Sequence, residues 1–166
     1  DAFDFERGKL IVHMGAWVLM PNHFHIYISS PKQGLGPGEL AITKFMLKLC
    51  TSYAKYFNKK YNRTGKLFED KFKSVHITKE NQAKYLFGYI HLNPIKLIFP
   101  RWKEEGIKDI KKATSFLDSY NWSSYYEYSG TSRSENKILS RENFLDYFSN
   151  TDSFKKDIFE WLNYES

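Results

Sequence analysis

The fold of this chain follows first from LIVHMGAWVLMPNHFHIYIS, residues 10–29. Its two halves, residues 10–19 and 24–29, are short and rich in aromatic and β-branched side chains, and Met20-Pro21-Asn22 lies between them. Such segments favour strands, and a sheet tolerates proline only at an edge, at a strand start or at a bulge. The stretch therefore predicts two strands or one bulged strand.

Two helices are expected after these strands. From Glu39 to Tyr61 apolar side chains recur at steps of three and four, a spacing typical of a long amphipathic helix. Thr78 has a side chain suited to capping a second helix, and Pro94 disfavours helical geometry at Asn93, where this helix should end or kink. Residues 66–77 alternate imperfectly between aromatic and polar side chains, which predicts a strand or ribbon between the two helices.

Length and composition favour one compact domain, because the chain has 166 residues of which 42% are apolar and 27% charged. We expect residues 1–128 to form this domain, the Ser, Gly and Thr-rich residues 129–134 to be a linker, and residues 135–166 to add a small helical extension. No run of 18 apolar residues exists, so no membrane partner is expected. The single cysteine, Cys50, excludes an internal disulfide and a multi-thiolate zinc site, and with the polar, acid-containing start favours a cytoplasmic setting.

Positive charge is concentrated in one segment. The formal charge of the chain is +6, yet residues 44–73 alone hold nine bases and two acids, a net charge of +7. A local basic block is a footprint that phosphate backbones select, although a solvated, lysine-rich helix face has the same composition. Four of the lysines are expected on the face of the first helix opposite its apolar side chains. The candidate nucleic-acid-binding residues are Lys44, Lys48, Lys55, Lys59, Arg63, Lys66, Lys71 and Lys73.

The most distinctive local pattern is Pro21-Asn22-His23-Phe24-His25. Two histidines one residue apart on a strand point to the same side, so His23 and His25 can share one metal ion. Imidazole pairs suit Zn, Mn, Fe, Co or Ni, and no acidic third ligand is obvious nearby. The alternative is that one histidine only forms a hydrogen bond at a strand edge.

Tyr89 and Asn93 form a second candidate site, because residues four apart on a helix lie one turn above the other. A metal ion held by the amide oxygen of Asn93 would lie close to the phenol of Tyr89. A phenol with an ordinary pKa of about 10 is a poor nucleophile, and a nearby cation reduces that difficulty. The alternative is a boundary tyrosine with its hydroxyl in water. The remaining histidines, His13, His76 and His91, are expected to be structural.

Taken together, four segments resemble the HUH-type single-tyrosine transposases, and most closely the branch associated with repetitive extragenic palindromes. The resemblance covers about residues 10–126, in the order and at the spacing of that family. The four segments are AWVLMPNHFHIYI (16–28), TKFMLKLCTSYAKYFNKKYNRTGKLFEDKFKS (43–74), YLFGYIHLNPIKL (85–97) and YNWSSY (120–125).

The resemblance implies a fold, a site and an activity. The fold would be a ferredoxin-like α+β domain with a central antiparallel sheet and flanking helices. Mg²⁺ or Mn²⁺ would be held by His23 and His25, with Asn93 in place of the glutamine common among relatives, and Tyr89 would be the nucleophile. The activity would be that of a metal-dependent endonuclease and strand transferase, acting on single-stranded or hairpin DNA through a 5′-phosphotyrosine intermediate. The enzyme would work at the nucleoid, and a homodimer is left open.

One departure and two alternatives accompany this resemblance. The family normally has a strand and a helix before the histidine strand, whereas only 22 residues precede His23, so we expect a further N-terminal segment in the full protein. The first alternative function is a non-catalytic protein, derived from a transposase, that binds hairpin DNA or RNA. The second is a zinc-dependent hydrolase on the same histidines, which would lack a third strong ligand and a carboxylate base.

Overall fold

The computed structural model describes residues 8–31, 38–144 and 150–163, and these residues form two compact units. The predicted domain, linker and extension boundaries stay predictions. The first unit contains residues 14–27 and the described residues from 77 onward, whereas the second contains residues 8–13 and the described residues between 28 and 76. The chain divides in this way because the segment from 28 to 76 contacts mainly itself. Each unit is described by itself below.

Strands β1 (His13–Leu19) and β2 (Phe24–Ser29) form a two-stranded antiparallel sheet, which confirms the prediction of two strands. The backbone N–H of Met20 donates to the carbonyl oxygen of His23 at 2.8 Å and closes the turn between them. These are the only two strands in the described part of the chain. The mixed α+β class is therefore confirmed, and the ferredoxin-like topology stays a prediction.

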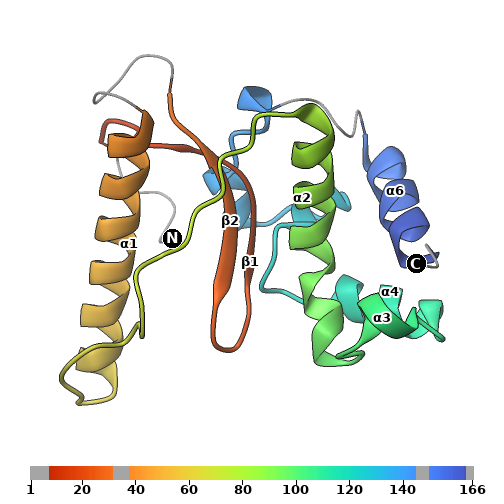
Figure 1. Cartoon of the computed structure of the whole chain (residues 1–166), viewed down its shortest axis with the longest axis horizontal. Helices are drawn as coiled ribbons and strands as arrows, with labels where there is room; N and C mark the ends of the chain where they lie inside the picture. The colour runs from red at the N-terminus through yellow and green to blue at the C-terminus, as the bar shows by residue number, and fades with distance from the viewer. Residues whose placement is uncertain (1–7, 32–37, 145–149, 164–166) are drawn as a thin grey trace. The chain divides into compact units, whose positions relative to one another are not determined.

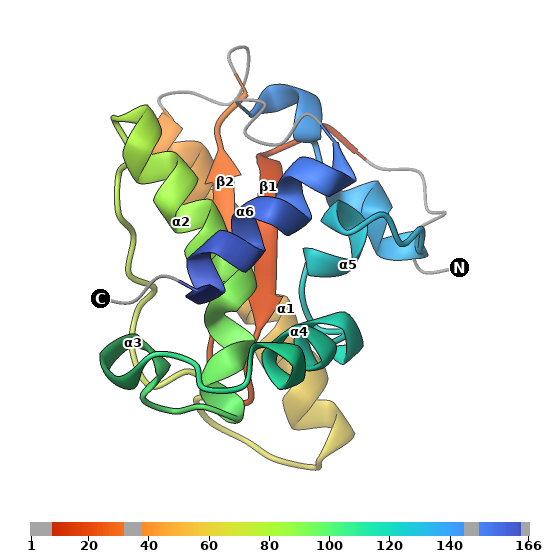
Figure 2. The same cartoon turned by 90° about the vertical axis from the view of Figure 1, so that its right-hand side faces the viewer.

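The core of the first unit lies between β1 and helices α2 (Glu80–Leu92), α4 (Ile110–Ser119) and α6 (Thr151–Asn163). Helices α2 and α6 lie side by side (Figure 1), and α6 also contacts α4 (Figure 2). Apolar side chains at helical spacing explain this arrangement, because each helix buries one stripe against the others. The buried members of the core are Ala16, Val18, Phe87, Ile90, Leu92, Ile95, Ala113, Leu117, Tyr125, Phe154, Ile158 and Leu162.

Helix α2 begins and ends close to the predicted positions. Its N-cap is Lys79, which has extended backbone angles and no capping side-chain hydrogen bond, so the prediction of a Thr78 cap was wrong. The helix ends at Leu92, as Pro94 predicts, but Asn93 keeps helical angles and begins the 3-10 helix η1 (Asn93–Leu97). A proline in the first turn of η1 needs no N–H donor there, so the chain tightens into this new turn instead of kinking away.

The second unit is built on helix α1 (Gly38–Lys60), which matches the long helix predicted. Four lysines that the sequence placed on one face, Lys44, Lys48, Lys55 and Lys59, are all exposed. The chain turns after α1, and Gly65 there has a φ of +89° that favours glycine. The expected strand over residues 66–77 was wrong: this segment is irregular and largely exposed, and no described strand pairs with its backbone.

The C-terminal part of the chain shares the core of the first unit. Within the helical extension expected over residues 135–166, α6 is present, whereas residues 145–149 lie outside the described part of the chain. Phe144 covers Gly15, where an added Cβ would meet the phenyl ring at 2.9 Å. Among the described residues, no helix combines the length and apolarity needed to cross a membrane. The remaining elements are α3 (Trp102–Glu105), α5 (Tyr125–Tyr128), η2 (Ser134–Ile138) and η3 (Arg141–Asn143).

Candidate functional site

The histidine pair lies at the start of β2. His25 is in the strand, His23 immediately precedes it, and their ring centroids are 5.1 Å apart. The Nδ1–H of His23 donates to the side-chain oxygen of Asn22 at 2.7 Å, because an amide oxygen only accepts. This hydrogen bond leaves Nε2 of His23 as the nitrogen that carries the lone pair, and a second partner of this kind is usual for metal-binding histidines.

His25 is partly buried beside His23. Burial lowers the pKa of His25, and the charges of His23 and Lys96 lower it further. A lowered pKa keeps the His25 imidazole neutral at neutral pH, which is the form that can bind a metal ion. The pair therefore has the placement, and His25 the proton state, that the metal hypothesis requires. The metal site itself stays a prediction.

Helix α2 brings Tyr89 to the same place. The ring centroid of Tyr89 is 5.6 Å from that of His25, with the two rings nearly perpendicular. Its other neighbour, Tyr85, lies one turn earlier on the helix, and the two phenol rings are stacked with centroids 6.4 Å apart. Tyr85 is the more exposed of the two, since 48% of its surface is accessible. The proximity of Tyr89 to the histidine pair is a tertiary contact between α2 and the β1–β2 hairpin.

Asn93 completes the predicted set and is fully buried. Neither its amide oxygen nor its amide nitrogen forms a hydrogen bond of ordinary length and angle with any described residue. The amide is nevertheless close enough to the Tyr89 hydroxyl to lower the pKa of that phenol by hydrogen bonding. An unpaired buried amide costs about 1–3 kcal/mol. The buried Asn93 side chain therefore calls for a partner, such as an ion or an ordered water.

Two lysines that the sequence analysis did not select lie at Tyr89. The ammonium nitrogen of Lys103 is 4.2 Å from the centre of the Tyr89 ring, and that of Lys96 is 5.6 Å from it. Partial burial alone would raise the pKa of Tyr89, but the Asn93 amide and the two lysine charges outweigh that effect and bring it below its ordinary value. A lowered pKa increases the phenolate fraction, which makes Tyr89 a better nucleophile.

The nearness of Lys96 to Tyr89 could be predicted from the sequence, whereas that of Lys103 could not. Lys96 lies in η1, one turn beyond Asn93, so its nearness to the site follows from helical spacing. Lys103 lies in α3, and only the path of the chain after η1 brings it back to Tyr89. No local pattern around Lys103 distinguishes it from the other lysines of the chain.

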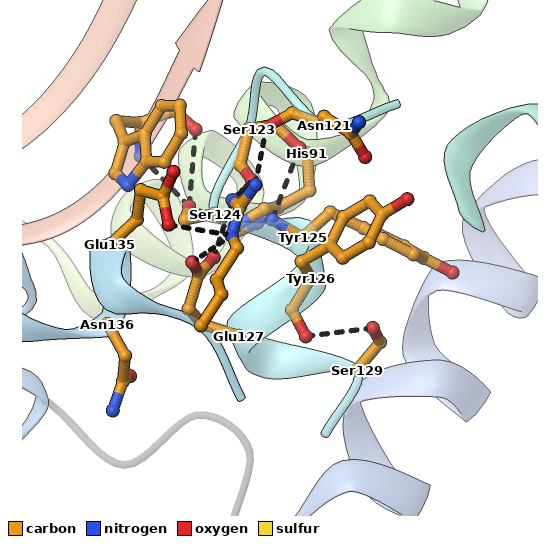
Figure 3. A network of polar contacts seen from close by, with 12 residues as sticks. His91, Asn121, Ser123, Ser124, Tyr125, Tyr126, Glu127, Ser129, Glu135 and Asn136 are labelled. Carbon is orange, nitrogen blue, oxygen red and sulfur yellow. Dashed lines mark hydrogen bonds and ion pairs between the residues drawn. The ribbon is translucent and has the colours of Figure 1, made fainter. Parts of the chain in front are cut away.

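A buried series of hydrogen bonds links β1 to the face of α2 opposite Tyr89 (Figure 3). His91, which is fully buried, donates from Nδ1 to the carbonyl oxygen of Phe87 at 2.9 Å. Its Nε2 accepts from the Ser124 hydroxyl at 2.8 Å, and that oxygen in turn accepts from the backbone N–H of Trp17 at 3.0 Å. His91 is thus a structural residue, as predicted, and it holds α2 against β1 directly behind Tyr89.

The ion pair between Arg133 and Glu127 lies beside these hydrogen bonds and orders the segment around α5 (Figure 3). Arg133 donates to the buried carboxylate of Glu127 at 2.5 Å and to the carbonyl oxygen of Ser123 at 2.6 Å. Its guanidinium also lies over the rings of Trp17 and Tyr126, at 5.4 and 4.9 Å. Glu127 and Arg133 therefore help to hold Ser124 in place through the neighbouring Ser123 carbonyl group, a role that could not be identified from the sequence.

The candidate nucleic-acid-binding residues, from Lys44 to Lys73, all belong to the second unit, whereas His23, His25, Tyr89 and Asn93 belong to the first. Within the second unit the basic residues are exposed. Arg63 lies over the ring of Phe57 at 5.5 Å. The structure thus presents these side chains to solvent, and their role stays a prediction.

The geometry of the first unit brings together two imidazoles, a phenol, a buried amide and two ammonium groups. Among the described residues, no cluster of three or more His, Cys, Asp and Glu side chains has the geometry of a metal site. The predicted metal site of His23, His25 and Asn93 stays a prediction. Such a set is suited to binding an anionic ester next to a nucleophilic oxygen. Comparison with protein-family models, with curated proteins and with solved structures gave no significant match to this chain.

Proposed function

We propose that this chain carries the catalytic domain of an HUH-type single-tyrosine transposase, which cleaves and rejoins single-stranded or hairpin DNA. The observation that carries the proposal is the contact between Tyr89 and the histidine pair, in which the Tyr89 ring lies 5.6 Å from that of His25. The buried amide of Asn93 lies beside the same phenol. These residues were selected from two motifs far apart in the sequence. A chance resemblance would give no reason for them to meet in space.

In the proposed reaction the Oη atom of Tyr89 attacks the phosphorus of one phosphodiester. A bond forms between Oη and phosphorus, and the bond from phosphorus to the 3′-oxygen breaks. The phenolic proton leaves Tyr89, while the departing 3′-oxygen takes up a proton. The 5′ end stays on the protein as a phosphotyrosine, and attack by another 3′-hydroxyl reverses the step and joins a new strand. One phosphodiester replaces another, so no external energy source is needed.

The residues at the site fit a divalent metal ion. Two imidazoles and an amide oxygen suit Mn²⁺, and Mg²⁺ would take more of its oxygen ligands from water or phosphate. The Asn22–His23 hydrogen bond would orient one ligand, and the unpaired amide oxygen of Asn93 would gain a partner. A metal ion bound there stabilises the negative charge that develops on the phosphate oxygens.

The chain's own residues would orient the nucleophile. The stack with Tyr85 and the edge contact with His25 restrict the Tyr89 ring from two sides. The His91–Ser124 hydrogen bond restricts the helix on which that ring is carried. Such restriction favours an in-line attack, because a reacting group held in position avoids an entropic cost at the transition state. The ferredoxin-like sheet implied by the resemblance would support this arrangement.

Covalent trapping tests the proposal. The protein is incubated with end-labelled hairpin oligonucleotides in Mn²⁺ or Mg²⁺, and denaturing gels with mass spectrometry locate any phosphotyrosine. We expect an adduct on Tyr89 that disappears in Tyr89→Phe, which removes only the hydroxyl. Tyr85→Phe is the matched control, because it alters the stacked neighbour one turn away and should retain the adduct. An adduct that persists in Tyr89→Phe contradicts the assignment of the nucleophile.

The non-catalytic alternative predicts a different outcome in the same experiment. A protein that only recognises hairpins would bind the oligonucleotides without forming an adduct in the wild type, with either metal ion. Binding without an adduct would therefore favour that alternative over the transposase.

A further inference from the structure

We propose that Lys96 and Lys103 together form the binding site for the phosphate that Tyr89 attacks. The inference rests on the proposed function in one respect, namely that the ligand is a phosphodiester of DNA. It adds a catalytic role for two residues that lie outside the basic segment of residues 44–73. A phosphodiester group carries one negative charge, and ammonium groups bind it as point charges with several donors.

The two lysines approach Tyr89 from different elements. Lys96 comes from η1, directly after the buried Asn93-Pro94-Ile95 segment, and Lys103 comes from α3. Their ammonium nitrogens lie 5.6 and 4.2 Å from the same ring centre. A phosphate in line with the Tyr89 hydroxyl would therefore have two positively charged neighbours that are fixed by separate parts of the fold.

Lys96 is central to the site. Its ammonium nitrogen lies 5.6 Å from the centre of the Tyr89 ring, and that ring is 5.6 Å from the ring of His25. Lys96 is therefore close to the proposed nucleophile, which itself contacts the proposed metal-binding imidazole. An anion that contacts Lys96 would lie next to both of them, which is where a phosphodiester must lie to be attacked.

Lys96 is not neutralised by the ion pair found at α3. The carboxylate of Glu105 is already paired with Arg101, at 2.7 Å across one helical turn. No described carboxylate forms an ion pair with Lys96. An anion bound at the Tyr89 hydroxyl would be attracted by both ammonium groups, because each lies close to the Tyr89 ring. Stacking of a lysine on an aromatic ring alone would explain the position of one cation, but it does not explain why two gather at Tyr89.

A double-mutant cycle between protein and DNA tests the site directly. Tyr89→Phe serves as the parent, because it prevents cleavage and keeps the aromatic ring, and binding is measured in EDTA by fluorescence anisotropy. A series of hairpin oligonucleotides is prepared, each with a neutral methylphosphonate in place of one phosphate. The replaced phosphate moves by one position from one oligonucleotide to the next. Lys96→Gln and Lys103→Gln are introduced singly into the parent. The control is Lys112→Gln, because Lys112 also lies over an aromatic ring, that of Phe99, at 5.7 Å.

We expect each lysine variant to weaken binding of unmodified DNA by about fivefold, the upper range for a partly exposed charge pair. At one phosphate position the methylphosphonate should abolish this difference, and the position should be the same for both lysines. Lys112→Gln should show no such position. Unchanged affinity in both lysine variants, or an equal loss at every methylphosphonate position, overturns the proposal.

The result separates this inference from the proposed function. If the wild type forms no phosphotyrosine adduct but one phosphate still cancels the effect of both variants, the phosphate site stands and catalysis fails. If the adduct forms and no such phosphate exists, catalysis stands and the lysine site fails. Where both succeed, the cancelling phosphate should be the one that the adduct contains.

Discussion

Acidification should destabilise the first unit through His91, which burial keeps neutral. Burial lowers the pKa of His91 to about 3, and the hydrogen bond to the Phe87 carbonyl does not offset it. In the unfolded chain the imidazole returns to a pKa of 6.5. Below that value the unfolded state binds a proton that the folded state does not bind. Stability contributed by neutral His91 is therefore complete above pH 6.5 and is lost as the pH falls toward 3.

The size of the effect follows from this difference in pKa. One proton of difference costs about 1.4 kcal/mol per pH unit, so between pH 7 and pH 5 the loss attributable to His91 is about 2 kcal/mol. That is a large share of the stability of an ordinary domain, which is about 5–15 kcal/mol. Acid sensitivity in this range should therefore be measurable.

Urea denaturation at pH 7 and pH 5 measures this loss. Tryptophan fluorescence reports on the unit that contains His91, because Trp17, Trp102, Trp122 and Trp161 all belong to it. His91→Gln is the comparison, since glutamine has both a donor and an acceptor but does not titrate. The variant should be less stable at pH 7, yet its loss on going to pH 5 should be smaller than that of the wild type by about 2 kcal/mol. Parallel losses in the two proteins would refute the reasoning, because shared carboxylates would then account for all of the change.

Three further predictions concern the metal site, the basic segment and the buried ion pair. Calorimetry should detect Mn²⁺ binding to the wild type and lose it in a His23→Ala, His25→Ala double variant; equal affinity in the two proteins excludes the histidine site. A plot of the logarithm of affinity for hairpin DNA against the logarithm of salt concentration should have a slope of about −0.7 per phosphate contact. Changing Lys66, Lys71 and Lys73 to Gln should make that slope less steep. An unaltered slope would leave those lysines as solvated residues. Arg133→Met should destabilise the protein by about 3–5 kcal/mol, because it leaves the Glu127 carboxylate buried and unpaired. Adding Glu127→Leu to this variant should restore stability in urea denaturation. If stability does not recover, the loss comes from the packing of the Arg133 side chain and not from the unpaired carboxylate.

Local periodicity accounts for the parts of this structure that the sequence predicted. The two-residue period of a strand placed His23 and His25 on one side, and their ring centroids lie 5.1 Å apart. The helical period placed Tyr89 one turn before Asn93 and exposed the lysines of α1. The end of α2 followed from the steric effect of Pro94 on the residue before it. Each of these predictions depends on only a few residues adjacent in sequence.

The predictions that failed depended on partners that local sequence does not specify. Residues 66–77 have side chains suited to a strand, but a strand needs a neighbour for its backbone groups, and no described strand supplies one. Thr78 has a good capping side chain, but the helix begins one residue later, after Lys79.

Lys103 lies at the Tyr89 ring although it belongs to none of the sequence motifs, so a site predicted from motifs alone lacks one of its cations. The route of the chain from Tyr89 to Lys103 is fixed by burial of Pro94 and Ile95 in η1, which anchors the chain before it returns through α3. Those buried residues carry no functional groups, yet they determine which cation reaches the phenol. Electrostatic tuning of Tyr89 is thus a property of the packed core as much as of the motif. It follows that substitutions in η1 should alter the chemistry of Tyr89 even where His23, His25 and Asn93 are unchanged.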